Sequence, residues 1–204
     1  MTHNIQSADL TTILSAVWRA LETGAQQAKH PFHTPVVATG GANDCDARVV
    51  VLRRASPALR ELAFHTDARA PKVRLLQTCH TTAWVFYDPA AKVQVRAKGV
   101  TAVHIGDETA AQAWLRTKLM SRRCYLAETA PSTPVDEPTS GLPAALLARS
   151  PTAEESEAGF VNFAVCVTTV ARLEWLYLAA RGHRRAAFVW DAAAERWQGT
   201  WLTP

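Results

Sequence analysis

The stretch KVQVRAKGVTAV, residues 92–103, alternates polar and apolar side chains over its first seven positions. Successive side chains of a β-strand point to opposite faces of the sheet. One face therefore carries Lys92, Gln94, Arg96 and Lys98, and the other carries Val93, Val95 and Ala97. The polar face either meets water or presents the Gln94 amide, which can both donate to and accept from the edge of a heterocycle.

Four other β-rich runs precede this one at short intervals: PVVATGG (35–41), ARVVVLRR (47–54), ELAFHTD (61–67) and TAWVFYD (82–88). Turn formers separate them at 40–44, 56–57 and 88–89. Three more strands are predicted in 160–178, 184–191 and 196–202. Strands this closely spaced are typical of an antiparallel sheet or barrel.

Helices are predicted at three places. Residues 7–28 have apolar side chains at helical spacing, which predicts a helix over about 8–26 with Ser7 or Asp9 as its N-cap. Shorter helices are expected in 68–79 and 107–119, and a long loop with one or two helical turns over about 128–159. We therefore expect a single α+β domain over 1–204, mainly β, with flanking helices around a barrel-like antiparallel sheet.

Composition excludes several classes of protein. No apolar run approaches the roughly 20 residues that cross a bilayer, and no secretory signal follows Met1, so a cytoplasmic location without membrane contact is expected. The four cysteines are far apart and form no CxxC pair, which predicts reduced, mostly structural thiols and no metal site. The net charge of +4 suits an anionic partner. Because the basic residues are dispersed, a small anion is favoured over nucleic acid.

Two stretches could bind a phosphate. In FHTDARAPK (64–72) a strand ends near Thr66, and Pro71 and Lys72 begin a helix whose free N–H groups favour anions. The alternative is a capped surface helix with a solvated lysine. In RVVVLR (48–53) a regular strand would place Arg48 and Arg53 on opposite faces, as phosphate ligands or as side chains that extend to water.

A third basic stretch lies near the C-terminus. LEWLYLAARGHRRAAF (173–188) combines Trp175 with four basic residues within five positions, Arg181, His183, Arg184 and Arg185. These groups must face water or an anion.

These motifs occur in an order that resembles the pyridoxamine 5'-phosphate oxidase-like, FMN-binding split-barrel family. The resemblance runs from about residue 34 to the C-terminus and is weakest over 119–158. It implies that Arg48 and Lys72 bind the FMN phosphate, with Arg53 near the ribityl chain or the open side of the flavin. The remaining cofactor contacts that it implies are Val49, Leu52, His65, Thr66 and Gln94, with Trp175 and Arg185 from the partner subunit. Arg181 and His183 would contact the substrate, and FMN would lie at a homodimer interface.

The sequence also departs from the family pattern. True oxidases have Lys at Arg53 and Arg at Pro71, and their Tyr, Arg and Ser clamp for the substrate phosphate meets Gln112, Arg116 and Met120 here. The resemblance therefore implies an FMN-dependent oxidoreductase whose substrate is unassigned. The alternatives are a true pyridoxamine 5'-phosphate oxidase, or a non-enzymatic flavin- or haem-binding protein with His65 and His183 as the first haem ligands to test.

Overall fold

The computed structural model describes residues 9–40 and 45–204. Ser7, one of the two expected N-caps, and most of the turn expected at 40–44 lie outside these residues. The other expected N-cap, Asp9, accepts the backbone N–H of Thr12 at 2.7 Å and begins helix α1 (Leu10–Gln26).

One nine-stranded sheet dominates the described part of the chain, and its strand pairs are antiparallel. Its strands are β1 (Val36–Gly40), β2 (Cys45–Val49), β3 (Leu52–Ser56), β4 (Glu61–Asp67), β5 (Thr81–Asp88), β6 (Val93–His104), β7 (Phe163–Tyr177), β8 (Arg184–Asp191) and β9 (Arg196–Leu202). The order is β2-β1-β5-β6-β7-β4-β3, with β8 on β7 and β9 on β8. The expected antiparallel sheet with flanking helices is confirmed, and the sheet is not closed into a complete barrel.

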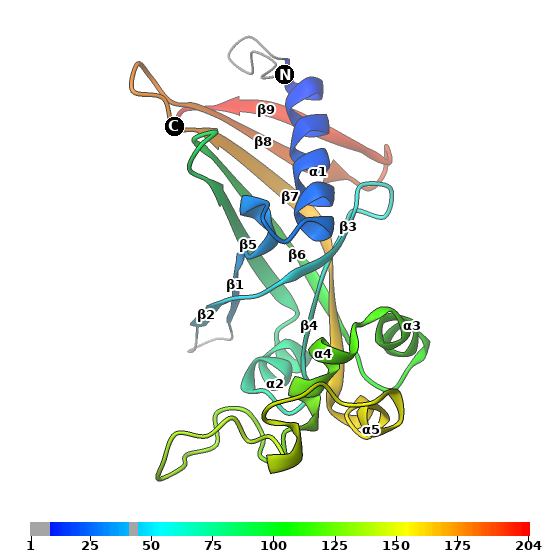
Figure 1. Cartoon of the computed structure of the whole chain (residues 1–204). Coiled ribbons are helices and arrows are strands. Elements are labelled where there is room, and N and C mark those ends of the chain that lie inside the picture. The colour runs from blue at the N-terminus through cyan, green and yellow to red at the C-terminus, as the bar shows by residue number, and fades with distance from the viewer. Residues whose placement is uncertain (1–8, 41–44) are drawn as a thin grey trace.

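Strand β7 organises the sheet. It pairs with β6 along almost its whole length. Its other edge is shared, because β4 pairs with its first half and β8 with its second half. Figure 1 shows β7 running from the helices α3 and α5 to the β8–β9 end of the molecule, where α1 also lies. The two ends of this strand therefore belong to different regions of the surface.

The sequence predicted one strand over the run 47–54, but this run is divided between two strands. Residues Val50 and Val51 lie outside the ladder, between β2 and β3, and the Val50 N–H donates to the Pro35 carbonyl at 3.0 Å. Strand β2 pairs with β1, whereas β3 pairs with β4, and these lie at opposite ends of the strand order. The chain must cross from one to the other, so the alternation of faces does not continue from Arg48 to Arg53.

Two groups of helices flank the sheet. Helix α1 packs against β3 and β9 and contributes Ile13, Val17, Trp18 and Leu21 to the main core. The 3-10 turn η2 (Pro31–His33) packs against α1 and β5. The second group is α2 (Pro71–Thr78), α3 (Glu108–Arg116), α4 (Leu119–Arg122) and α5 (Ala153–Glu157), with the 3-10 turns η3 (Arg123–Leu126), η4 (Ala144–Leu146) and η5 (Phe160–Asn162). The expected long loop does contain two helical turns, η4 and α5.

The core is divided in two. The larger part lies between the sheet and α1, with Trp84, Phe64 and Phe86 fully buried. The smaller part gathers Trp114, Tyr125 and Phe163 under α3. This second cluster attaches the segment that follows α3 to the first half of β7.

The cysteines are all free thiols, but only Cys166 is buried. Cys45 and Cys124 are exposed and Cys79 is half-buried. None of the helices among residues 9–40 and 45–204 has the length and hydropathy needed to cross a bilayer.

Candidate cofactor and substrate site

A cluster of cationic and hydroxyl groups lies where β2, the end of β4 and the start of α2 meet. The Lys72 ammonium donates to Thr66 Oγ1 at 3.2 Å. Arg48 donates to Thr39 Oγ1 at 2.7 Å and forms an ion pair with Asp46. Pro71 begins α2 as the sequence predicts, so Lys72 stands in its first turn. We call Arg48, Thr66 and Lys72 the phosphate cradle.

The electrostatics of the cradle suit an anion. Burial lowers the pKa of Lys72, and the nearby charge of Arg48 lowers it further. The fold thus holds two like charges close together, although each would be better solvated alone. A phosphate that accepts hydrogen bonds from both would relieve this repulsion. The cradle therefore fits the phosphate of FMN, with Asp46 as a competing partner on the exposed side of Arg48.

A cavity of about 750 Å³ lies between the end of α1, strands β3 and β4, and helix α3. Arg53 lines this cavity and lies in a β-bulge. Leu52 pairs with Phe64 and Arg54 pairs with the adjacent Ala63, so no residue of β4 is left to pair with Arg53. A bulge changes the direction of one side chain without ending the strand. Arg53 is exposed here, whereas Leu52 is fully buried in the core.

The wall of this first cavity is cationic. Arg53, Arg116 and Lys118 line it and form no ion pair with any residue that the structure describes. Arg54 also lines it but pairs with Glu61 at 2.7 Å. One carboxylate, Glu108, faces these groups. The cavity is therefore suited to a ligand with a negatively charged group.

His65 stands at the edge of the first cavity and also lines a second cavity of about 450 Å³. Its ring packs edge-on against Phe163, with 4.8 Å between the centroids. Burial, together with the charge of Arg53, lowers its pKa to about 4. The imidazole is thus neutral near pH 7, and it separates two cavities of different polarity.

The outer face of the sheet carries another predicted contact, Gln94. It lines a small cavity of about 110 Å³ with Arg96, Glu174, Leu176 and Arg185. Glu174 accepts from Arg185 at 2.6 Å, from Arg172 at 2.9 Å and from Arg96 at 3.4 Å. Burial by itself would raise the pKa of Glu174, but these three arginines outweigh it and lower the pKa.

Trp175 does not share this outer face. It is 3% exposed and packs in the main core, stacked on Tyr177. Since neighbours on a strand point to opposite faces, Leu176 lies beside Gln94 and Arg185 instead. The expected cofactor contact of Trp175 stays a prediction, and it is Leu176 that occupies the surface between the two polar residues.

Arg181 and His183 are exposed in the loop between β7 and β8. Thr66 of the cradle pairs with Ala164 at the start of β7, whereas this loop follows Tyr177 at its end. At about 3.3 Å per residue, the strand separates the two places by roughly 40 Å. One chain therefore does not bring Arg181 or His183 to its own cradle, nor His183 to His65.

Comparisons with known proteins identify chains with a similar fold. Residues 15–105 match the family model described as pyridoxamine 5'-phosphate oxidase, FMN-binding domain. No curated protein sequence matches the chain. A pyridoxamine 5'-phosphate oxidase-related, FMN-binding protein of Nostoc punctiforme is similar in structure, with a TM-score of 0.72, 17% identity, and 97% of this chain and 100% of that chain covered. PhzG of Burkholderia lata, in complex with tetrahydrophenazine-1-carboxylic acid, has a TM-score of 0.68 at 17% identity, with 97% and 94% covered.

The chain has the pyridoxamine 5'-phosphate oxidase-like fold. The resemblance seen in the sequence is thus confirmed, and the matched part of the chain includes the cradle residues Arg48, Thr66 and Lys72. At 17% identity the solved structures show the fold alone.

The three residues that depart from the oxidase clamp do not all lie in the first cavity. Gln112 and Arg116 of α3 line the first cavity. Met120 is 56% exposed, and its sulfur accepts a hydrogen bond from Ser150 instead. Of the three positions that the resemblance aligns with the oxidase clamp, the cavity therefore contains Gln112 and Arg116 but not Met120.

The sequence analysis missed Arg54, Lys118, Glu174 and Leu176. The charged residues gave no local signal, because each is one of many in a sequence with 22 Lys and Arg and 18 Asp and Glu residues. The burial of Trp175, and with it the position of Leu176, follows from the register of β6, β7 and β8. That register becomes visible only in the folded sheet.

Proposed function

We propose that the protein is an FMN-dependent oxidoreductase whose substrate carries a negatively charged group. The observation that carries the proposal is that strand β4 connects two cationic features: Thr66 belongs to the phosphate cradle, and the neighbouring His65 lines the first cavity with Arg53, Arg116 and Lys118. Arg48 and Lys72 would hold the phosphate. Gln94 lies opposite Leu176 near the far end of β7, so it would contact the edge of the ring system from a second copy of the chain. Bound FMN supplies two-electron redox chemistry.

The chain's own residues would position the substrate. Arg53 and Arg116 would orient its anionic group, and the neutral His65 would offer one hydrogen bond without adding charge. The structural neighbour PhzG, whose crystal structure is a complex with tetrahydrophenazine-1-carboxylic acid, supports a carboxylate as the negatively charged group of the substrate.

We further propose that the working form is a homodimer. Arg181 and His183 lie roughly 40 Å along β7 from the cradle, so they can meet a flavin there only if a second copy supplies them. Exposed Val49, Val36 and Val85 follow one another across β2, β1 and β5 and form an apolar row that a second copy would cover.

The purified protein tests the cofactor directly. We expect the yellow absorption of a flavin in the protein as isolated or after reconstitution, and FMN on mass analysis of the released small molecule. A colourless protein that takes up no FMN would overturn the proposal.

A true pyridoxamine 5'-phosphate oxidase is the second candidate, because Arg116 lies in the cavity and the Arg181-x-His183 pattern is present. It requires oxygen-dependent formation of pyridoxal phosphate by the FMN-loaded protein. Holoprotein that gives no turnover of pyridoxamine 5'-phosphate excludes this candidate and leaves the broader proposal intact.

A further inference from the structure

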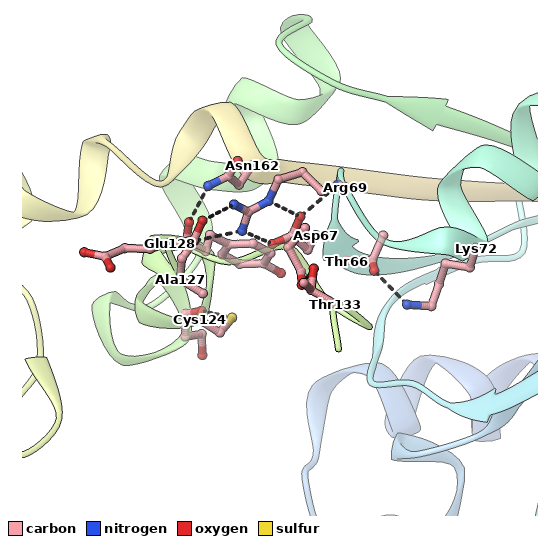
Figure 2. A network of polar contacts seen from close by, with 12 residues as sticks. Thr66, Asp67, Arg69, Lys72, Cys124, Ala127, Glu128, Thr133 and Asn162 are labelled. Carbon is pink, nitrogen blue, oxygen red and sulfur yellow. Dashed lines mark hydrogen bonds and ion pairs between the residues drawn. The ribbon is translucent and has the colours of Figure 1, made fainter. Parts of the chain in front are cut away.

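The first and second cavities lie end to end on one face of β4. Side chains alternate along a strand, so His65 and Asp67 point to one face and Thr66 points to the other. His65 lines both cavities, and Asp67 lines the second. Figure 2 shows the same division, with Asp67 directed to Arg69 and Thr66 directed to Lys72. The second cavity therefore continues the first, whereas the Thr66 side chain belongs to the phosphate cradle.

Two segments form walls that run from the first cavity to the second. On β4, Ala63 lines the first cavity and Asp67 lines the second. On the segment from α4 to η3, Ser121 lines the first cavity and Tyr125 lines the second. At about 3.3 Å per residue, Ala63 and Asp67 lie roughly 13 Å apart along β4. A ligand that occupies both cavities is therefore longer than a single ring.

The loop 127–141 covers the second cavity and is held in a defined position. Its ends meet, because the Glu128 N–H donates to the Gly141 carbonyl at 2.9 Å. The Arg69 guanidinium pairs with Asp67 at 2.8 Å and donates to the carbonyls of Glu128 at 3.4 Å and of the residue before it at 2.9 Å (Figure 2). The loop is thus fixed to the end of β4, and compact loops whose ends meet are frequently functional.

The second cavity is suited to an uncharged group. Of the described residues around it, Asp67 is the one with an ionised side chain, and Arg69 pairs with it. Burial and the Arg53 charge lower the pKa of His65 to about 4, and burial raises the pKa of Tyr125, so both rings are neutral near pH 7. Surroundings that disfavour the charged forms of their own side chains also disfavour a charged ligand.

The walls of the second cavity combine apolar surface with hydroxyl groups. The apolar and ring-bearing side chains are His65, Tyr125, Ala127, Ala130, Pro131 and Val135. The hydroxyls come from Thr129, Ser132, Thr133, Thr139 and Ser140. Three of them form hydrogen bonds with nearby backbone, whereas Thr129 and Ser132 have no hydrogen-bond partner among residues 9–40 and 45–204. A hydroxyl can both donate and accept, and apolar walls with a few such groups are typical of ligand sites.

We propose that the second cavity binds the far end of an elongated substrate, an uncharged ring with a hydrogen-bonding group, while the carboxylate of the same substrate binds in the first cavity. This inference rests on the proposed function, in which the negatively charged group of the substrate lies beside Arg53 and Arg116. The loop 127–141 would then select substrates by their length and by the absence of charge at the far end.

Three carboxylates test the subsite when their binding to the FMN-loaded protein is measured by calorimetry: benzoate, biphenyl-4-carboxylate and 4'-hydroxybiphenyl-4-carboxylate. All three carry the same anionic group, the second adds a ring, and the third adds a hydroxyl at the far end of that ring. We expect the added ring to tighten binding by about tenfold or more. The added hydroxyl should tighten it by about a further fivefold.

Two loop variants separate the ring from the hydroxyl. Thr129→Val/Ser132→Gly removes the two hydroxyls that have no partner in the described protein, and the glycine suits the positive φ at 132. It should abolish the gain from the ligand hydroxyl and keep the gain from the ring. The second variant replaces residues 129–140 by two glycines, which the contact between Glu128 and Gly141 can accommodate. It should abolish both gains and leave the affinity for benzoate unchanged.

Arg116→Ala distinguishes a failure of the subsite from a failure of the proposed function. It removes a cation that all three carboxylates share, so it should weaken the three by one factor and leave their ratios unchanged. If it changes none of the three affinities, the anionic site of the proposed function fails, while the ratios and their dependence on the loop still test the subsite. If the protein binds no FMN, the same ratios are measured on the flavin-free protein.

Thr78→Val, on the exposed end of α2, is the control and should leave all three affinities unchanged. The subsite is refuted if the biphenyl compounds bind no tighter than benzoate, or if the loop replacement leaves their advantage intact.

Discussion

The Lys72 ammonium and the Thr66 hydroxyl lie 3.2 Å apart, across the connection from the end of β4 to the start of α2. This contact lies on the face of β4 opposite to His65 and Asp67, because side chains alternate along a strand. The Lys72 ammonium also gives the cradle a measurable pH dependence.

The affinity for FMN should fall in alkaline solution. Burial and the Arg48 charge lower the pKa of Lys72 below its usual 10.5, so its positive charge is lost at a lower pH than that of a free lysine. Above the lowered pKa, the Kd of FMN should rise about tenfold per pH unit, up to the limit set by the contribution of one charge. Titrations between pH 7 and 10 measure this rise.

The variant Lys72→Arg should flatten the alkaline limb, since a guanidinium stays protonated over the whole range. Lys72→Ala should weaken FMN binding at pH 7 by about tenfold or more. Lys98→Ala, on an exposed face of β6, is the control and should behave as the wild type. An identical profile for wild type and Lys72→Arg would assign the alkaline loss to another group.

The stability of the fold should fall in acid because of His65. The folded-state pKa is about 4, lowered by burial and the Arg53 charge, against 6.5 for the free side chain. Between these values the unfolded chain binds a proton that the folded chain does not, so the free energy of unfolding decreases as the pH falls from 6.5 to 4. The loss amounts to about 3 kcal/mol in total.

Urea unfolding of wild type and His65→Gln at pH 7 and pH 4.5 isolates this effect, because the two proteins share every other titratable group. We expect the wild type to lose more stability than the variant on acidification, by about 2 to 3 kcal/mol. Parallel losses in the two proteins would contradict the lowered pKa.

Two defective chains should complement one another if the homodimer is correct. Lys72→Ala damages the cradle, and Arg181→Ala/His183→Ala damages the loop at the other end of β7. In a mixed dimer one of the two sites is built from undamaged residues of both chains. Mixing after unfolding and refolding should restore about a quarter of wild-type flavin reduction, the statistical yield for random pairing in a C2 dimer. If a mixture that is shown to be dimeric recovers no flavin reduction, then Lys72 and the pair Arg181 and His183 do not act in one shared site.

The variant Gly99→Ala should be strongly destabilising. Gly99 lies at the register shift between β6 and β7, and a Cβ there would come within 2.0 Å of the Thr169 carbonyl oxygen. Because the obstacle is backbone, the strands must separate locally, at a cost of about 3 kcal/mol. The melting temperature measures this cost. Gly106→Ala separates the clash from backbone strain, because Gly106 has open space around it but a φ of 65°, where alanine costs about 1 kcal/mol.

Much of the fold could be predicted from local sequence. Strand β4 occupies 61–67 as expected, and α2 begins at Pro71. These elements carry their own signals, alternation in one and an N-terminal proline in the other. The cradle could be predicted only in part, since the local sequence left both Lys72 and Arg48 open between a ligand and a solvated side chain.

By itself, the sequence determined most of the elements, the polar and apolar faces of β6 and the start of α2 at Pro71, because these depend on neighbours within a few positions. Tertiary structure alone decided that Val50 and Val51 leave the sheet, that Trp175 enters the core and that the loop 127–141 closes over Asp67. Each of these depends on pairing between segments tens of residues apart, such as Arg69 with Ala127. Such pairings depend on which strand edges and cavities remain open once the sheet has formed. A local sequence pattern does not contain this information.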